Sequence, residues 1–114
     1  MEKITELGTI KISDNVFERL VKESVSLTEN RDTLAVERKP IIVTDREDML
    51  IIEFHVVHRF GTSLRHSSKV VLDHMESCLK PLRLGKPVLV RMMVVAIKAR
   101  RSVKRDLEFS RIII

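Results

Sequence analysis

Residues 49–60 read MLIIEFHVVHRF, and residues 88–99 read VLVRMMVVAIKA. Both segments are rich in β-branched and other apolar side chains, so we predict that both are strands. Alternate residues of a strand face opposite sides, and the apolar side of the first segment comprises Leu50, Ile52, Phe54 and Val56. The second segment is apolar on both sides, which is typical of a central strand or of one that a partner covers.

Two amphipathic helices are predicted around these strands. Ser13 or Asp14 can cap the first helix, and Thr62 or Ser63 can cap the second, which should end near Pro81. The apolar stripe of the first helix comprises Val16, Phe17, Leu20, Val21 and Val25. The stripe of the second comprises Leu64, Val71, Leu72, Met75, Cys78 and Leu79. Because each helix is apolar on one side only, that side must pack on another element.

The remaining apolar segments complete the predicted order β-α-β-β-α-β. Residues 7–12 alternate as a short strand does, and residues 34–43 form a strand that Pro40 interrupts at an edge, a bulge or a break. We therefore expect an α+β fold, with a mixed sheet of three to four strands and both helices packed on one face. Residues 1–100 should form a single domain, and residues 101–114 a basic C-terminal tail or an additional strand.

The composition indicates a globular chain with one core. It has 114 residues, of which 44% are hydrophobic and 32% charged. The lone Cys78 has no disulfide partner, and its place in an apolar stripe favours a buried side chain. No apolar run reaches the roughly 18 residues that span a bilayer, and residues 1–6 lack the apolar core of a secretory signal. We therefore expect a cytoplasmic protein.

The common signatures of enzymes are absent from the sequence. It contains no Gly-rich phosphate loop, Cys-x-x-Cys pair, nucleophile elbow or His-Glu-x-x-His motif. His66 and His74 are eight residues apart, whereas metal pairs on a helix are spaced by three or four. His55 and His58 point to opposite faces of a strand. We therefore predict no catalytic residue, no cofactor and no metal site.

Two groups of basic residues are candidates for binding anions or partners. The first lies beside the start of the second helix, where free backbone amides favour an anion, and comprises Arg59, Arg65, His66 and Lys69. The second is the partner-binding tail, with Arg100, Arg101, Lys104 and Arg105. Residues 100–114 carry five cations and two anions, which is +3 of the formal charge of +5. Acidic lipid headgroups, nucleic acid or an acidic protein would all suit the tail.

The side of the sheet that faces away from the helices is the predicted interaction surface. Glu53, His55, Arg59 and Arg91 keep part of it polar. Its apolar residues are Ile51, Val57, Leu89, Met93, Val95 and Ile97. An uncovered apolar area of this kind favours self-association.

Three segments of the chain resemble the alkaline-shock protein family, a group of small bacterial envelope-stress proteins. Residues 8–16 resemble the beginning of the family's domain, which has a glycine, then a strand of alternating apolar residues, and then a Ser-Asp pair where a helix starts. Residues 60–64 resemble its aromatic-Gly strand exit, and residues 88–97 its closing strand. The resemblance covers about residues 7–100. Residues 26–30 replace the family's Gly-Val pair, Phe60 replaces its tyrosine, and the basic tail is less familiar.

The resemblance implies a non-enzymatic cytoplasmic accessory or scaffold protein that acts in bacterial envelope homeostasis under alkaline stress. Such a protein would gather at the membrane through a partner, and no family catalytic residue exists to carry over. We expect a homo-oligomer with protein partners, some of them membrane-anchored, and no small-molecule substrate.

A KH-like RNA-binding module is the alternative, because β-α-β-β-α-β domains with basic patches also occur among these modules. Against it, the chain has no Gly-x-x-Gly loop, no Trp or Tyr, and four Phe residues for base stacking. Nucleic acid is therefore the less favoured partner.

Overall fold

The computed structural model describes residues 2–5, 8–29, 34–36, 40–58, 64–98 and 101–114, and the side chains of residues 12–27, 40–57, 65–94 and 107–114. The elements are β1 (Glu2–Thr5), β2 (Gly8–Lys11), α1 (Asp14–Glu29), β3 (Leu34–Val36), β4 (Ile42–Asp45), β5 (Leu50–His58), α2 (Leu64–Leu79), a 3₁₀ turn (Lys80–Leu82), β6 (Val88–Lys98) and β7 (Arg101–Ile113).

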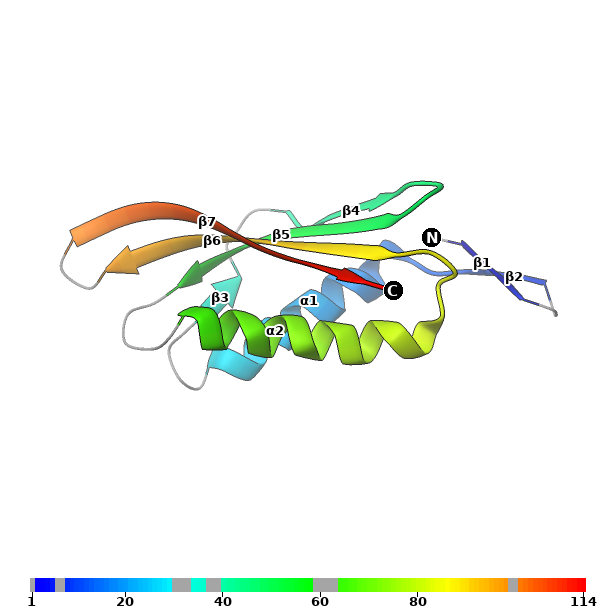
Figure 1. Cartoon of the computed structure of the whole chain (residues 1–114), viewed down its shortest axis with the longest axis horizontal. Helices are drawn as coiled ribbons and strands as arrows, with labels where there is room; N and C mark the ends of the chain where they lie inside the picture. Colours follow the sequence, from blue (N-terminus) through cyan, green and yellow to red (C-terminus); the bar gives the residue numbers. More distant parts are fainter. Residues whose placement is uncertain (1, 6–7, 30–33, 37–39, 59–63, 99–100) are drawn as a thin grey trace.

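The main sheet is mixed, as predicted. β5 and β6 are parallel and α2 connects them, whereas β3 and β4 run antiparallel to β5, and β7 runs antiparallel to β6. β6 lies between β5 and β7, so the prediction of a central strand is confirmed. α1 and α2 cover the same face of this sheet (Figure 1), which confirms the α+β class.

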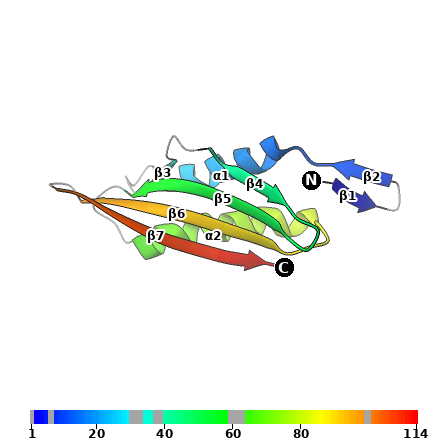
Figure 2. The same cartoon turned by 90° about the horizontal axis from the view of Figure 1, so that it is seen from above.

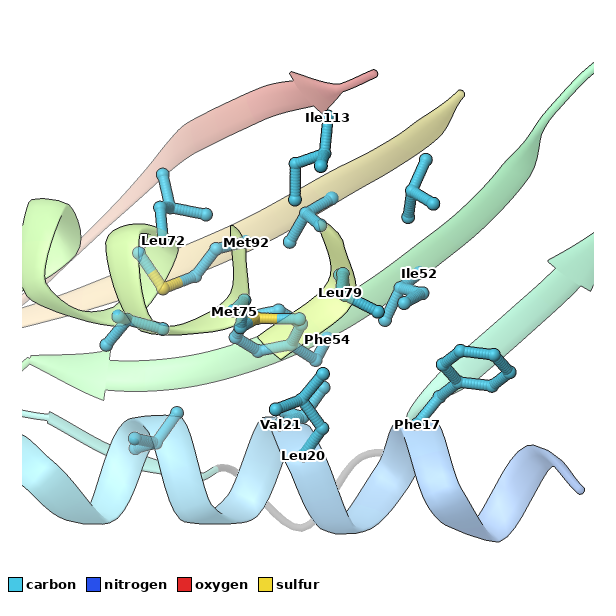
Figure 3. Close-up of a cluster of buried hydrophobic side chains, with 14 of the residues drawn as sticks. Phe17, Leu20, Val21, Ile52, Phe54, Leu72, Met75, Leu79, Met92 and Ile113 are labelled. Carbon is cyan, nitrogen blue, oxygen red and sulfur yellow. The ribbon is translucent and has the colours of Figure 1, made fainter. Parts of the chain in front are cut away.

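The hydrophobic core lies between that face and the helices (Figure 3). Alternate residues of β5 and β6 point into it, namely Leu50, Ile52, Phe54, Val56, Val88, Val90, Met92 and Val94. The helices contribute Phe17, Leu20, Val21, Val25, Val71, Leu72, Met75 and Leu79. The predicted core faces of both strands are therefore confirmed, together with most of both helical stripes.

Pro40 marks a break in an edge strand. β3 pairs with the end of β5, from Leu34 opposite His58, and β4 pairs with its beginning, from Asp45 opposite Leu50. Proline lacks the amide hydrogen of a ladder bond, so a continuous strand cannot pass through it without losing a hydrogen bond. The predicted interruption is confirmed as a break between two short strands.

The strand order differs from the prediction at the beginning of the chain. β2 pairs with β1 in a separate two-stranded sheet that extends beyond the main sheet (Figure 2). A hairpin closes a short loop and so loses less chain entropy than a distant pairing does. Residues 8–11 therefore pair with the neighbouring residues 2–5, and the expectation that they join the main sheet is wrong. At the other end β7 lies beside β6, which is the additional strand given above as one of two alternatives for residues 101–114.

The start of α1 matches the predicted cap, but one predicted core residue is misplaced. The backbone N–H of Asn15 donates to Ser13 Oγ at 3.3 Å, so Ser13 is the capping residue. Val16 was expected in the buried stripe and is 49% exposed. It belongs to the first turn, and it lies beside Arg19 and Leu82 on an open groove rather than under the sheet.

Arg111 links the last strand to α2. Its Nη1 lies 2.6 Å from Asp73 Oδ1 and 3.3 Å from Glu76 Oε2, and its side chain is 26% exposed. These contacts tie the edge strand β7 to α2, between Phe109 and Ile113, which pack on the core. Charge-assisted hydrogen bonds of this kind are stronger than neutral ones.

We predict that Arg111→Met lowers the free energy of unfolding by about 1 kcal/mol, because it keeps the apolar stem and removes the charged bonds. Urea denaturation at low and high salt measures the change, which should shrink as salt rises. Arg46→Met, at an exposed turn, is the matched control and should have no effect. Equal effects from both substitutions would contradict the anchoring role.

Candidate functional site: the outer face of the sheet

The outer face is the side of the main sheet opposite α1 and α2 (Figure 1). The alternation that buries Leu50, Ile52, Val88 and Val90 places their neighbours on this side. Its described side chains are Ile42, Thr44, Ile51, Glu53, His55, Val57, Leu89, Arg91, Met93, Glu108, Ser110 and Ile112. No described helix or strand lies over this side of the sheet. Its side chains differ in exposure, since Ile51 is 7% exposed, whereas Ile42 and Ile112 are about half exposed.

An apolar row crosses the outer face near one end of the sheet. The pairing places Ile51 beside Leu89 and Leu89 beside Ile112. Ile112 is 59% exposed and Ile42, on β4, is 46% exposed. Large exposed β-branched side chains next to other apolar groups mark a surface that gains free energy when a partner covers it.

A row of charges runs beside this apolar row. Arg91 Nε lies 2.6 Å from Glu108 Oε1, and Arg91 Nη1 lies 3.6 Å from Glu53 Oε1. The hydrogen bond and charge of Glu108, and then the charge of Glu53, raise the pKa of the Arg91 guanidinium above its ordinary value. Arg91 is therefore a permanent cation shared by two carboxylates, and the row has a net charge of −1.

His55 contributes an unsatisfied polar atom to the outer face. Its side chain is half-buried, and its Nδ1 is buried without a hydrogen-bond partner among the described residues. A buried polar atom without a partner costs free energy that a new hydrogen bond can recover.

The predicted anion-binding cluster is described only in part. Arg65, His66 and Lys69 lie exposed on the first turns of α2, whereas Arg59 lies outside the described residues. Arg65 and Lys69 are four residues apart and so share one side of the helix. The cluster as a whole stays a prediction.

The basic residues expected in the tail belong to a strand. Arg101, Lys104 and Arg105 lie in β7, which pairs with β6, and Arg100 lies outside the described residues. A role for these cations in partner binding also stays a prediction.

Neither a metal centre nor a bilayer-spanning helix is found within the described residues. No group of three or more His, Cys, Asp or Glu side chains in this part of the chain is arranged to hold a metal ion. Neither α1 nor α2 combines the length and the apolar composition that crossing a bilayer requires. Cys78 is half-buried, with Sγ 3.7 Å from His74 Nε2, and packs against the core.

Comparison with known proteins gives no family. No protein-family model matches this chain, and no curated protein matches it. The geometry of the outer face is therefore the main evidence on function.

Two parts of the arrangement were missed by sequence reasoning. Glu108 was counted as tail charge, although it completes the charged row on the outer face. Arg111 was counted as tail charge too, although it pairs with α2. Both residues lie in β7, and the register of that strand is needed before either partner can be identified.

Proposed function

We propose that this chain is a non-enzymatic assembly module that binds further copies of itself, and other proteins, through its outer face. The observation that carries the proposal is an open sheet face on which Ile42 and Ile112 are about half exposed. α1 and α2 use their apolar stripes on the opposite face. Association with another molecule would remove the exposed side chains of Ile42 and Ile112 from water.

The charged row defines the kind of partner that fits. Burying Glu53, Arg91 and Glu108 against a wholly apolar surface would cost more than their mutual attraction returns. A partner must therefore be apolar opposite Ile51, Leu89 and Ile112, and polar or cationic opposite the charged row. This mixed character is typical of exchangeable protein interfaces, which are about as polar as the rest of a protein surface.

The resemblance to the alkaline-shock family supports a more specific role. In this proposal the chain is a cytoplasmic accessory or scaffold protein in bacterial envelope homeostasis under alkaline stress, held near the membrane by a partner. The order of elements from α1 to β6 supports it, because this order is that of the resemblance except that two short strands, β3 and β4, replace the single strand interrupted at Pro40. The outer face is the surface through which such a scaffold would assemble.

The proposal predicts that the purified chain associates in a concentration-dependent way. Light scattering coupled to size-exclusion chromatography, run over a concentration series, should show dimers or larger species. A specific interface commonly buries about 1,200–2,000 Å² in total, and the outer face is the surface offered for it. A strictly monomeric chain at the highest concentrations would contradict the proposal.

RNA binding is separated from assembly by a salt titration. A phosphate-binding module binds a mixed oligonucleotide pool at low salt and loses affinity as salt rises. We expect no binding at low salt, because the outer face of the described chain carries a net negative row and no Phe, Tyr or Trp side chain. Saturable, salt-sensitive binding would favour the KH-like alternative.

Partner capture from cells needs point variants rather than a truncation. Removing residues 100–114 would remove β7, together with the buried Ile113 and the Arg111 contacts to α2. If the truncated chain lost its partners, the loss would reflect unfolding of the chain rather than removal of a binding surface. Ile112→Glu is the appropriate variant, because Ile112 is exposed.

A further inference from the structure

A cavity of about 340 Å³ lies beyond the end of α2, between the following loop and the ends of β6 and β7. Both views place the end of β7 beside this loop (Figures 1 and 2). The accessible apolar lining of the cavity is made by Leu84, Pro87 and Ile114, and Leu79, Val88 and Ile113 lie almost fully buried behind them. The volume falls near the lower end of the range for small-molecule pockets, about 300–1,000 Å³.

The rim of this cavity is cationic. Lys86 Nζ pairs with the Asp45 carboxylate and donates to the Arg46 carbonyl oxygen at 2.6 Å. Lys80 Nζ lies 3.6 Å from Glu76 Oε1. The guanidinium of Arg83 has no ion-pair partner among the described residues, so it is the uncompensated charge of the rim.

The backbone at Arg83 is unusual for an arginine. Its φ of 47° lies in the left-handed region, where it closes the 3₁₀ turn with its N–H donating to the Lys80 carbonyl oxygen at 3.2 Å. Glycine or asparagine fits such a position with less strain. Gly85, with φ of 80°, has the expected residue type for this region. Arginine adopts this conformation at a modest energetic cost, and here its side chain lines the cavity.

The helix dipole explains part of the positive charge but not all of it. Cations stabilise the carbonyl end of a helix, and Lys80 already supplies one there. That effect requires neither a guanidinium in a strained conformation nor an apolar cavity beside it. A ligand with an apolar body and one negative group would use both the apolar lining of the cavity and the guanidinium beside it.

We propose that this cavity binds a small anionic amphiphile, an alkyl chain that ends in a carboxylate. The alkyl chain lies on Leu84, Pro87 and Ile114, and the carboxylate accepts hydrogen bonds from the Arg83 guanidinium, whose planar fork matches it. The ligand is bound and not converted. This site is separate from the outer face and does not depend on the proposed function.

Isothermal titration calorimetry with sodium decanoate, below its micellar concentration, tests the proposal. Decanoate should bind, and decyltrimethylammonium, which has the same chain and the opposite charge, should not. Arg83→Asn should bind decanoate about ten- to a hundredfold more weakly, since it loses a charge-assisted pair. Its melting temperature should stay equal or rise, because asparagine tolerates the left-handed conformation.

Two controls make the result decisive. Arg46→Asn removes a nearby exposed cation that does not line the cavity, and it should keep the full decanoate affinity. Arg83→Lys keeps the charge without the fork and should give an intermediate affinity. The proposal is overturned if decanoate does not bind, if the cationic analogue binds as well, or if Arg83→Asn keeps its affinity.

Other roles for Arg83 give distinct results. A fall in both melting temperature and affinity in Arg83→Asn would assign Arg83 to the fold and overturn its role as a ligand. Phosphatidylglycerol vesicles serve as a second probe. Binding to these vesicles without binding to decanoate would assign the rim to a membrane surface and overturn the cavity proposal.

Discussion

Ile112→Glu should convert the associating chain to a monomer over the concentration range in which the original chain self-associates. Ile112 is 59% exposed on the outer face, so the substitution leaves the core intact. Burying an isoleucine contributes about 1.5–3 kcal/mol, and a glutamate at this position would bring an unpaired charge into the interface. The association constant should fall at least tenfold, which sedimentation velocity measures directly.

Leu107→Glu is the matched control for this prediction. Leu107 lies in the same strand, is 40% exposed, and pairs with Val94 on the side of the sheet that faces the helices. Both variants add one negative charge to β7. If both variants weaken association equally, net charge rather than the outer face is responsible, and the assignment of the interface is wrong.

Phe54→Ala should lower the free energy of unfolding by about 3–5 kcal/mol, the usual cost of removing a buried aromatic ring. Phe54 is 0% exposed and lies in β5, in the core between the sheet and the helices (Figure 3). Small domains are stable by about 5–15 kcal/mol, so this loss removes much of the total. Guanidinium denaturation followed by circular dichroism gives the value.

The control for Phe54→Ala is Leu27→Ala, on α1, where the leucine is 55% exposed. It removes apolar atoms from a position that is largely in water, so it should cost well under 1 kcal/mol. Comparable losses from the two substitutions would mean that β5 does not lie under the helices as described.

Local periodicity was enough to predict most elements and their buried faces. Phe54 was assigned to the apolar side of its strand because it alternates with the polar Glu53 and His55, and alternation in a strand depends on backbone geometry alone. Pro81 marked the end of α2 for a similarly local reason, namely the missing amide hydrogen. Properties that depend on neighbouring residues in the chain were therefore predictable.

Pairing between distant segments was not predictable in the same way. Residues 8–12 alternate as a strand in any sheet, and nothing in them selects β1 as the partner. Residues 101–113 mix charges with apolar residues, so they fitted a tail as well as a strand until β6 was seen to pair with them. Which strands pair depends on the entropy lost when the chain between them closes into a loop, and on which sheet edges are still unpaired. Neither property can be read from the sequence of one segment.

The candidate sites also differ in whether they depend on local alternation or on pairing between distant segments. The apolar outer face was predicted from the alternation of β5 and β6, before any pairing was known. The charged row needs the register of β7, which brings Glu108 to Arg91. The cavity beside Arg83 arises where a loop meets two strand ends, and no periodic pattern marks such a place.

The most direct test of the account measures whether the outer face is covered in the assembled chain. In a Cys78→Ser background, a cysteine is placed either at Ser110, exposed on the outer face, or at Ser77, exposed on α2. The rate of thiol labelling is then followed as protein concentration rises. We predict that labelling slows at position 110 and stays constant at position 77. Equal labelling rates at both positions, unchanged across the whole concentration range, would contradict the claim that this chain assembles through its outer face.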